Sequence, residues 1–199
     1  MVCEAVVISR YVLRTSPFIH PLSLESKLRT NQSTTRLTLK ADPSPPPPLL
    51  PLLPTLTGTI LDLGPGTGAH LVHLNPSKIT HVYGLEPCVA LHDTLWENAE
   101  KAGLGGKYTV VGRGVEEVLG MEGEEGKEGE KRILSGLEKY GIKEGEVDTI
   151  LAVRVLCCVP DLKPVAHGLR QTLRPNTGQI LFFEHIRARS FFPRLLQGK

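Results

Sequence analysis

The densest cluster of chemically useful residues is a glycine-rich segment that directly follows a short apolar run. It carries Asp62 and three alternating glycines, Gly64, Gly66 and Gly68. Glycine permits a tight turn and lets a ligand approach the backbone without a clash against a Cβ atom. Backbone N–H groups at the start of a following helix would point at that ligand. The segment therefore predicts a loop that binds a small molecule, with a glycine-rich turn that holds no ligand as the alternative.

A second candidate is Glu86, the acid that closes the next apolar run along the chain. A carboxylate at this place can accept hydrogen bonds from both ribose hydroxyls of a nucleoside. The ends of neighbouring parallel strands meet at one edge of a sheet, so we expect Glu86 to lie close to the glycine loop. Together the two features predict a site for a nucleoside-containing ligand, either a nicotinamide dinucleotide or S-adenosylmethionine.

Alternating apolar segments supply the elements that would position these residues. Five short apolar runs predict strands, at residues 59–63, 81–85, 108–111, 147–153 and 179–185. Two segments with apolar residues at helical spacing predict helices, at 91–102 and, capped by Asp161, at 161–173. Strands that alternate with helices indicate an α/β fold with a Rossmann-like, doubly wound and mostly parallel sheet.

Details around the loop separate the two ligands. The spacing Gly64-x-Gly66-x-x-Ala69 fits the dinucleotide pattern. By contrast, Asp62 lies two residues before the first glycine, and the glycines continue to Gly68 at alternate positions. The acid and the alternation favour the methyl donor S-adenosylmethionine.

Three segments carry a resemblance to a known family. Residues 60–68 resemble motif I of class I S-adenosylmethionine-dependent methyltransferases, and residues 147–159 resemble the fourth-strand region of the type 11 methyltransferase domain. Residues 173–185 resemble the fifth-strand region of that domain, and the pieces Val-Leu-Cys-Cys-Val and Phe-Glu-His are similar to the methyltransferase-like thiol methyltransferases. The resemblance covers about residues 57–190.

The resemblance implies a role for each matching position. The three glycines would line the methionine part of the donor, and Asp62 would hold the loop and the donor's amino group. Glu86 would bind the ribose hydroxyls, residues 113–116 would lie against adenine, and residues 152–153 would flank the methionine end. The implied donor-binding residues are Asp62, Gly64, Gly66, Gly68, Glu86, Pro87, Gly114, Val115, Ala152 and Val153. Val115 departs from the family, in which an acid or alanine is common at that position.

Methyl transfer from a sulfonium needs alignment more than acid–base chemistry, because the methyl group is already activated. A thiol acceptor needs little help, since its thiolate is the nucleophile. His185 is a weak candidate for a general base, with a structural strand-end histidine as the alternative. Cys157 and Cys158 are interpreted as small core residues rather than nucleophiles.

The predicted function is methyl transfer from S-adenosylmethionine to a small-molecule acceptor, for which a thiol is one candidate. Two alternatives stay open. One is a truncated, noncatalytic module that binds the cofactor, and the other is a nicotinamide-dependent oxidoreductase.

The other segments divide the chain around this domain. Residues 1–42 lack sustained periodicity, which predicts a poorly ordered or targeting segment. A run of prolines predicts a stiff polyproline II linker over 43–56. The methyltransferase domain is expected at 57–190, with a charged insertion rich in Glu, Lys and Gly at 120–146 and a short tail at 191–199.

The C-terminal end of the domain is expected to be incomplete. Class I domains usually have seven strands, and the few residues after His185 are too short for a helix and two more strands. We therefore expect a sheet that lacks its last two strands. Its fifth strand would then be an exposed apolar edge through which the chain self-associates.

The amino-acid composition limits the expected binding partners and the expected cellular location of the protein. A net charge of +2 over 199 residues gives no basic footprint for nucleic acid. The four cysteines lack zinc-site spacing, so no metal site is predicted, and their usage indicates a reducing, intracellular environment. No segment reaches the apolar length of a transmembrane helix, although peripheral membrane contact stays open. The expected location is cytoplasmic, with mitochondrial targeting by the basic N-terminal segment as the alternative.

Overall fold

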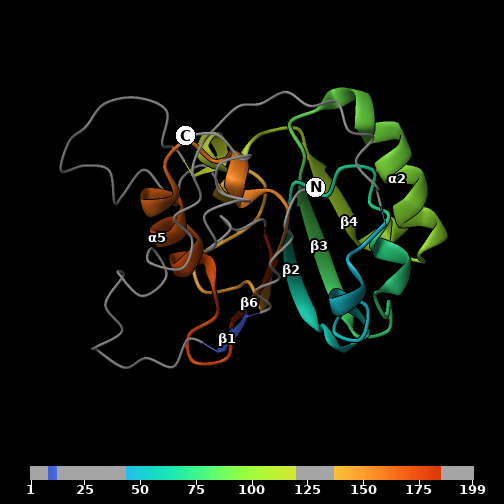
Figure 1. Cartoon of the computed structure of the whole chain (residues 1–199), viewed down its shortest axis with the longest axis horizontal. Helices are drawn as coiled ribbons and strands as arrows, with labels where there is room; N and C mark the ends of the chain where they lie inside the picture. Colours follow the sequence, from blue (N-terminus) through green and yellow to red (C-terminus); the bar gives the residue numbers. More distant parts are fainter. Residues whose placement is uncertain (1–8, 13–43, 120–136, 185–199) are drawn as a thin grey trace, which may run out of the picture.

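A mixed six-stranded sheet forms the centre of the computed structural model, which describes residues 9–12, 44–119 and 137–184 (Figure 1). The strand order is β1-β6-β5-β2-β3-β4. Five strands are parallel to one another: β2 (Gly58–Leu63), β3 (Ile79–Leu85), β4 (Tyr108–Val111), β5 (Thr149–Val153) and β6 (Gln179–Phe183). The predicted α/β fold with a mostly parallel sheet is therefore confirmed.

The strand order places a topological switch point between β2 and β5. The chain runs outward from β2 through β3 to β4, then returns to the other side of β2 for β5 and β6. Leu63, the last residue of β2, pairs with Leu85 of β3 and with Ala152 of β5. Ligands of doubly wound sheets bind beyond the carboxyl ends of the strands at this point. The loops after β2, β3 and β5 therefore surround the expected site.

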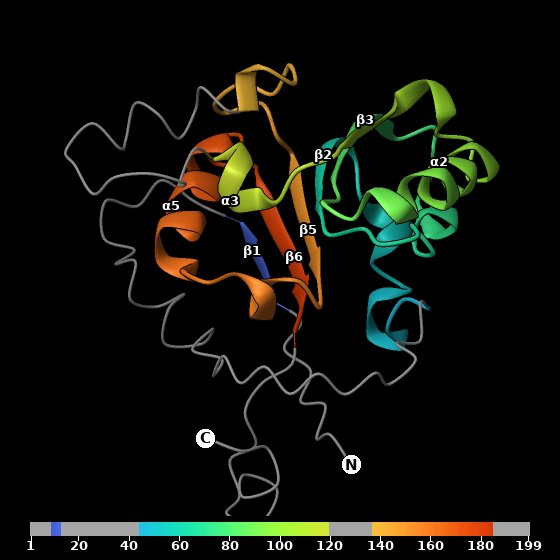
Figure 2. The ribbon, with the colours of Figure 1, turned by 90° about the horizontal axis from the view of Figure 1, so that it is seen from above.

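Helices cover both faces of the sheet (Figure 2). On one face lies α2 (His92–Lys101), and on the other lie α3 (Val115–Val118) and α5 (Leu162–Thr172). Successive strand residues alternate between two cores, so Ile60 packs on the α2 side and Leu61 on the α5 side. Both faces of the parallel strands are thus buried, which explains why their sequences are apolar throughout.

The start of α5 and the end of α2 each depend on one residue of suitable type. The Asp161 side chain accepts a hydrogen bond from the backbone N–H of Lys163 and caps the start of α5. After α2, Gly103 adopts a φ of +72°, and its N–H donates to the carbonyl of Glu100. Glycine makes this left-handed conformation accessible, which stops the helix and turns the chain toward β4.

The proline-rich segment differs from the expected polyproline II spacer. It folds into two short 3-10 helices, Pro47–Leu49 and Leu53–Thr55. Leu49, Leu53 and Leu56 are buried and belong to the same core as α2. The leucines change the outcome because burying their side chains stabilises a compact turn, while proline tolerates the first turn of a helix. The described part of this segment therefore packs against the α2 side of the sheet and belongs to the domain core.

The outer edge of β6 is not exposed, so that prediction is wrong. The strand β1 (Ser9–Val12) pairs with it in the antiparallel sense, from Ser9 opposite Phe182 to Val12 opposite Gln179 (Figure 2). Self-association through a free edge of β6 loses its basis, because β1 already occupies the backbone groups on that side. Four residues of the segment predicted as poorly ordered thus extend the sheet.

The second half of the predicted insertion also joins the domain. Leu137 and Ile142 are buried in the core on the α5 side, and Gly141 turns the chain between them with a φ of +81°. Residues 120–136 and the predicted tail lie outside the described ranges. Within those ranges, no helix is long and apolar enough to cross a membrane.

We predict that Leu53→Ala lowers the free energy of unfolding by about 2–5 kcal/mol, because it removes a fully buried side chain and leaves a cavity. Urea denaturation followed by circular dichroism measures the change. Leu50→Ala is the matched control, since Leu50 is only half-buried. Equal urea midpoints for the two variants would show that the proline-rich segment is a spacer after all.

Candidate functional site

The glycine loop after β2 combines close packing with an open backbone. Gly64 and Gly66 both have a φ of +59°, a conformation that residues with a Cβ rarely adopt. A Cβ on Gly64 would come within 2.7 Å of the Val155 side chain, so this position also needs glycine for packing. A Cβ on Gly66 would meet no atom of the described ranges within 4 Å. The backbone at Gly66 is therefore accessible to a ligand.

Glu86 touches this loop directly. Its Oε2 accepts a hydrogen bond from the backbone N–H of Gly66 at 2.8 Å, and its Oε1 accepts one from Cys88 at 2.9 Å. The N–H of Gly64 donates to the carbonyl of Leu85 at 2.9 Å, which holds the start of the loop against the end of β3. Glu86 is only 6% exposed. The structure thus brings together the two features that the sequence marked as one ligand site.

Asp62 lies beneath the loop and is paired with a residue that the sequence analysis did not select. Its Oδ2 is 2.8 Å from Nε2 of His70, and both side chains are buried. Burial lowers the pKa of His70, but the charge of Asp62 and the hydrogen bond to it more than offset this, so that pKa lies above its usual value. The contact between Asp62 and His70 therefore joins the two ends of the loop.

Helix α2 contributes two further tethers that the sequence analysis missed. The Asn98 side-chain amide donates to the carbonyl of Thr67 at 2.8 Å, and Nε2 of His92 lies 2.7 Å from the carbonyl of Glu86. His92 and Asn98 are each three residues from the buried Leu95, so they share its face of the helix. Polar residues on the core side of a helix were the available signal.

Tyr108 of β4 places a hydroxyl near both carboxylates. The hydroxyl is buried and has no hydrogen-bond partner within the described part of the chain. It lies over Gly84, where a Cβ would collide with it, so glycine at that position makes room for the ring. Burial, followed by the charges of Asp62 and Glu86, raises the pKa of Tyr108 well above its usual value. The site thus has a neutral hydroxyl within the electrostatic influence of two acids.

The other implied donor-binding residues lie around this centre at varied depth. The N–H of Glu86 donates to the carbonyl of Val111, which brings the turn that follows β4 beside Glu86. In that turn Gly114 precedes α3, while Val115 is buried in the core. Pro87 is exposed and Val153 is half-buried. Ala152 is fully buried, and His185 lies outside the described residues.

The end of β5 is held in a strained conformation by the end of β6. Arg154 has a φ of +57°, although it is not glycine, and its N–H donates to the carbonyl of Phe183 at 2.7 Å. Oε1 of the buried Glu184 accepts hydrogen bonds from the N–H groups of Val155 and Leu156, each at 2.8 Å. Burial raises the pKa of Glu184, and the backbone hydrogen bonds oppose this only in part. Such strain gathers at functional sites.

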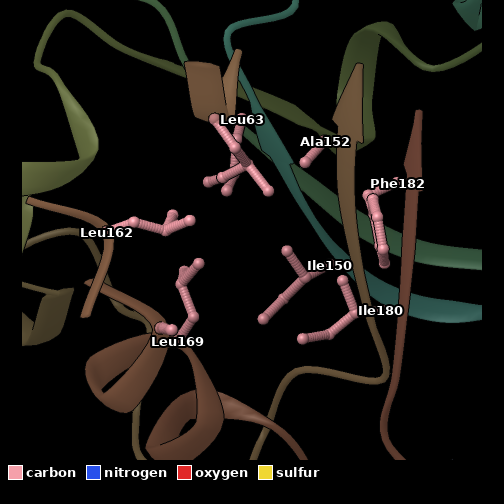
Figure 3. A pocket seen from close by; sticks show the side chains of 9 residues that line it. Leu63, Ile150, Ala152, Leu162, Leu169, Ile180 and Phe182 are labelled. Carbon is pink, nitrogen blue, oxygen red and sulfur yellow. The ribbon is translucent and has the colours of Figure 1, made fainter. Parts of the chain in front are cut away.

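An apolar hollow lies between the sheet and α5 (Figure 3). Leu162 and Leu169 of α5 point toward Leu63, Ile150 and Ile180 of the sheet. The cavity is small, about 20 Å³, which leaves room for roughly one water molecule. Its lining includes Ile150 and Ile180 in the sheet and Leu63 at the end of β2.

The sequence of this chain matches the model of a known protein family. The model of a methyltransferase domain matches residues 28–198. The chain belongs to this family. The match confirms the predicted methyltransferase class, and S-adenosylmethionine is the cofactor that this class implies. The narrower resemblance to thiol methyltransferases stays a prediction.

Solved structures are similar to this chain at low sequence identity. A proposed S-adenosyl-L-methionine-dependent methyltransferase from Methanococcus maripaludis is 14% identical, with 67% of this chain and 52% of that chain covered and a TM-score of 0.48. A precorrin 8W decarboxylase from Methanobacterium thermoautotrophicum is 18% identical, with 70% and 64% covered and a TM-score of 0.46. This chain spans about half the length of the Methanococcus protein. No curated protein matches the chain.

The pair of Asp62 and His70 leads to a test of what fastens the loop. We predict that His70→Ala lowers the free energy of unfolding by about 3–5 kcal/mol, because it leaves a buried carboxylate without its partner. His70→Asn should cost less, since its amide can still donate to Asp62. His73→Asn, on the same short turn, is the matched control. Chemical denaturation measures all three variants.

The same pair gives a pH dependence with a definite sign. The raised pKa of His70 means that folding favours its protonated form. The ionic stabilisation is complete below the ordinary histidine pKa of about 6.5 and is lost as the pH rises through the raised value. This change of stability with pH should be absent in His70→Asn. An identical pH profile in wild type and variant would show that His70 does not provide it.

Proposed function

We propose that this chain binds S-adenosylmethionine across the glycine loop and Glu86, and transfers its methyl group to a small-molecule acceptor. The observation that carries the proposal is the contact between Oε2 of Glu86 and the N–H of Gly66. It joins a ribose-binding acid and a glycine loop at the switch point of a doubly wound sheet. Membership of the methyltransferase family supplies the class of reaction.

The residues present fit a nucleoside donor. A carboxylate oxygen has about two acceptor positions, and each oxygen of Glu86 uses one for a backbone N–H. The remaining positions can accept from the two ribose hydroxyls. A Cβ at Gly66 would meet none of the described residues within 4 Å, so the methionine part can lie along the loop. The turn at 112–114 then adjoins the expected place of the adenine.

Catalysis in this arrangement consists of positioning and exclusion of water. The bound sulfonium supplies an activated methyl group. The fixed loop and Glu86 orient the donor. The strained end of β5 lies at the same carboxyl edge of the sheet, beside the end of β2. Holding the two reactants in line lowers the entropic part of the barrier. No described residue has to remove a proton from an acceptor that already reacts as a thiolate.

A thiol is the acceptor class that we test first. The resemblance of the Val-Leu-Cys-Cys-Val and Phe-Glu-His pieces to thiol methyltransferases supports it. An intracellular location also stays a proposal, which rests on the cysteine usage of the sequence.

The decisive experiment measures methyl transfer from isotopically labelled S-adenosylmethionine to a panel of alkyl thiols. We expect transfer that depends on the thiol and exceeds transfer to the matching alcohols at least about tenfold, because thiols form the nucleophilic anion far more readily. Transfer that is faster to the alcohols would contradict the thiol class alone. Donor binding without transfer to any acceptor would overturn the enzymatic proposal in favour of a noncatalytic module.

A further inference from the structure

Two adjacent cysteines occupy the short 3-10 helix Leu156–Cys158 that follows β5. Their sulfur atoms are 3.9 Å apart. Cys158 is exposed and Cys157 is partly exposed, and both are free cysteines. The interpretation of both as small core residues is therefore wrong for Cys158. Two thiols this close, and open to solvent, can act on one centre together.

The backbone around the two thiols is fixed by contacts that precede any ligand. Glu184 binds the N–H groups of Val155 and Leu156, and the N–H of Cys158 donates to the carbonyl of Val155 at 2.9 Å. The Cys157 thiol itself lies 3.8 Å from the carbonyl oxygen of Arg154. Because these contacts hold the turn, little conformational entropy is lost when both sulfurs bind one centre.

The separation of the sulfurs suits a centre that takes two thiolates. With sulfur bonds of about 2.3 Å, as for zinc thiolates, two sulfurs can bind one centre when they are less than about 4.6 Å apart, and the spacing of 3.9 Å meets this condition. Thiolates prefer soft centres. Among the described residues, no group of three or more His, Cys, Asp or Glu side chains is placed to hold a metal ion. The fitting ligand class is therefore one that is satisfied by two protein sulfurs.

We propose that Cys157 and Cys158 form a dithiol site for organic compounds of trivalent arsenic that carry one carbon substituent. Such a compound, in its hydrated form, has two hydroxyl groups on arsenic. Each cysteine loses its S–H bond and the arsenic loses one As–OH bond per cysteine, so that two As–S bonds form and two water molecules leave. Arsenic stays trivalent and no oxidant or reductant is needed. The site does not depend on the methyl donor.

The protonation state of Cys157 agrees with this chemistry. Burial, the neighbouring Glu184 carboxylate and Cys158 raise the pKa of Cys157 to about 12. Cys157 is therefore a thiol at neutral pH, which makes it a poor nucleophile for alkylating agents. In the exchange with arsenic hydroxyls, the thiol proton leaves within the water that is released.

The probe for the test is phenylarsine oxide, added to the full-length reduced chain in the presence of excess glutathione. We expect intact-mass spectrometry to show one phenylarsenic group per chain. The group should withstand glutathione, a monothiol, and should leave on addition of dithiothreitol, a dithiol. Absence of the adduct, or its removal by glutathione, would overturn the proposal.

Variants then assign the adduct to this pair. Linking two binding groups raises affinity on the order of 10²–10⁴-fold, so Cys157→Ser and Cys158→Ser should each weaken binding of the probe at least about 100-fold. Cys88→Ser is the matched control, because Cys88 is an exposed free cysteine outside the pair. Cys158 is exposed, so its variant should melt like wild type and decides the question even if Cys157→Ser folds poorly. Unchanged binding in Cys158→Ser would refute the site.

Discussion

The contact between the N–H of Gly66 and the carboxylate of Glu86 is the constraint on which the candidate site depends. A carboxylate that is almost fully buried needs hydrogen-bond donors, because losing water without replacement is costly. The fold supplies them by bringing the ends of β2 and β3 together, and the positive φ of Gly66 turns its N–H toward the acid. One interaction thus satisfies a buried charge and shapes the loop that a donor would contact.

A second group of polar contacts holds the same loop at other points. Asp62 and Glu86 are both buried acids, so each needs hydrogen-bond partners of its own. His70 pairs with Asp62, whereas backbone N–H groups donate to Glu86. Asn98 adds a tether from α2 to the loop. The loop is therefore held from the sheet and from a helix, which preorganises it for a ligand.

Much of this arrangement could be predicted from the sequence because its signals are local. Apolar runs located the five parallel strands, and residue type and position selected Glu86 and the glycines. The pairing of β1 with β6 joins residues from opposite ends of the chain. The local sequence allows a short strand near Val12, but it does not predict the strand with which this segment pairs. The proline-rich segment was misread because proline rules describe the backbone, whereas burial of Leu49, Leu53 and Leu56 decided its fold. The pairing of His70 with Asp62 also could not be predicted from the sequence, because it depends on the path of the loop between them.

Calorimetric titration of S-adenosylmethionine and of NAD into wild type and Glu86→Gln tests the central claim most directly. S-adenosylmethionine should bind wild type and NAD should not. Glu86→Gln should bind the donor at least about tenfold more weakly, because a hydrogen bond to a charged group contributes about 1.5–3 kcal/mol. Glu97→Gln, which alters an exposed acid of α2, should bind like wild type. Equal donor affinity in Glu86→Gln and wild type, or binding of NAD alone, would contradict the account.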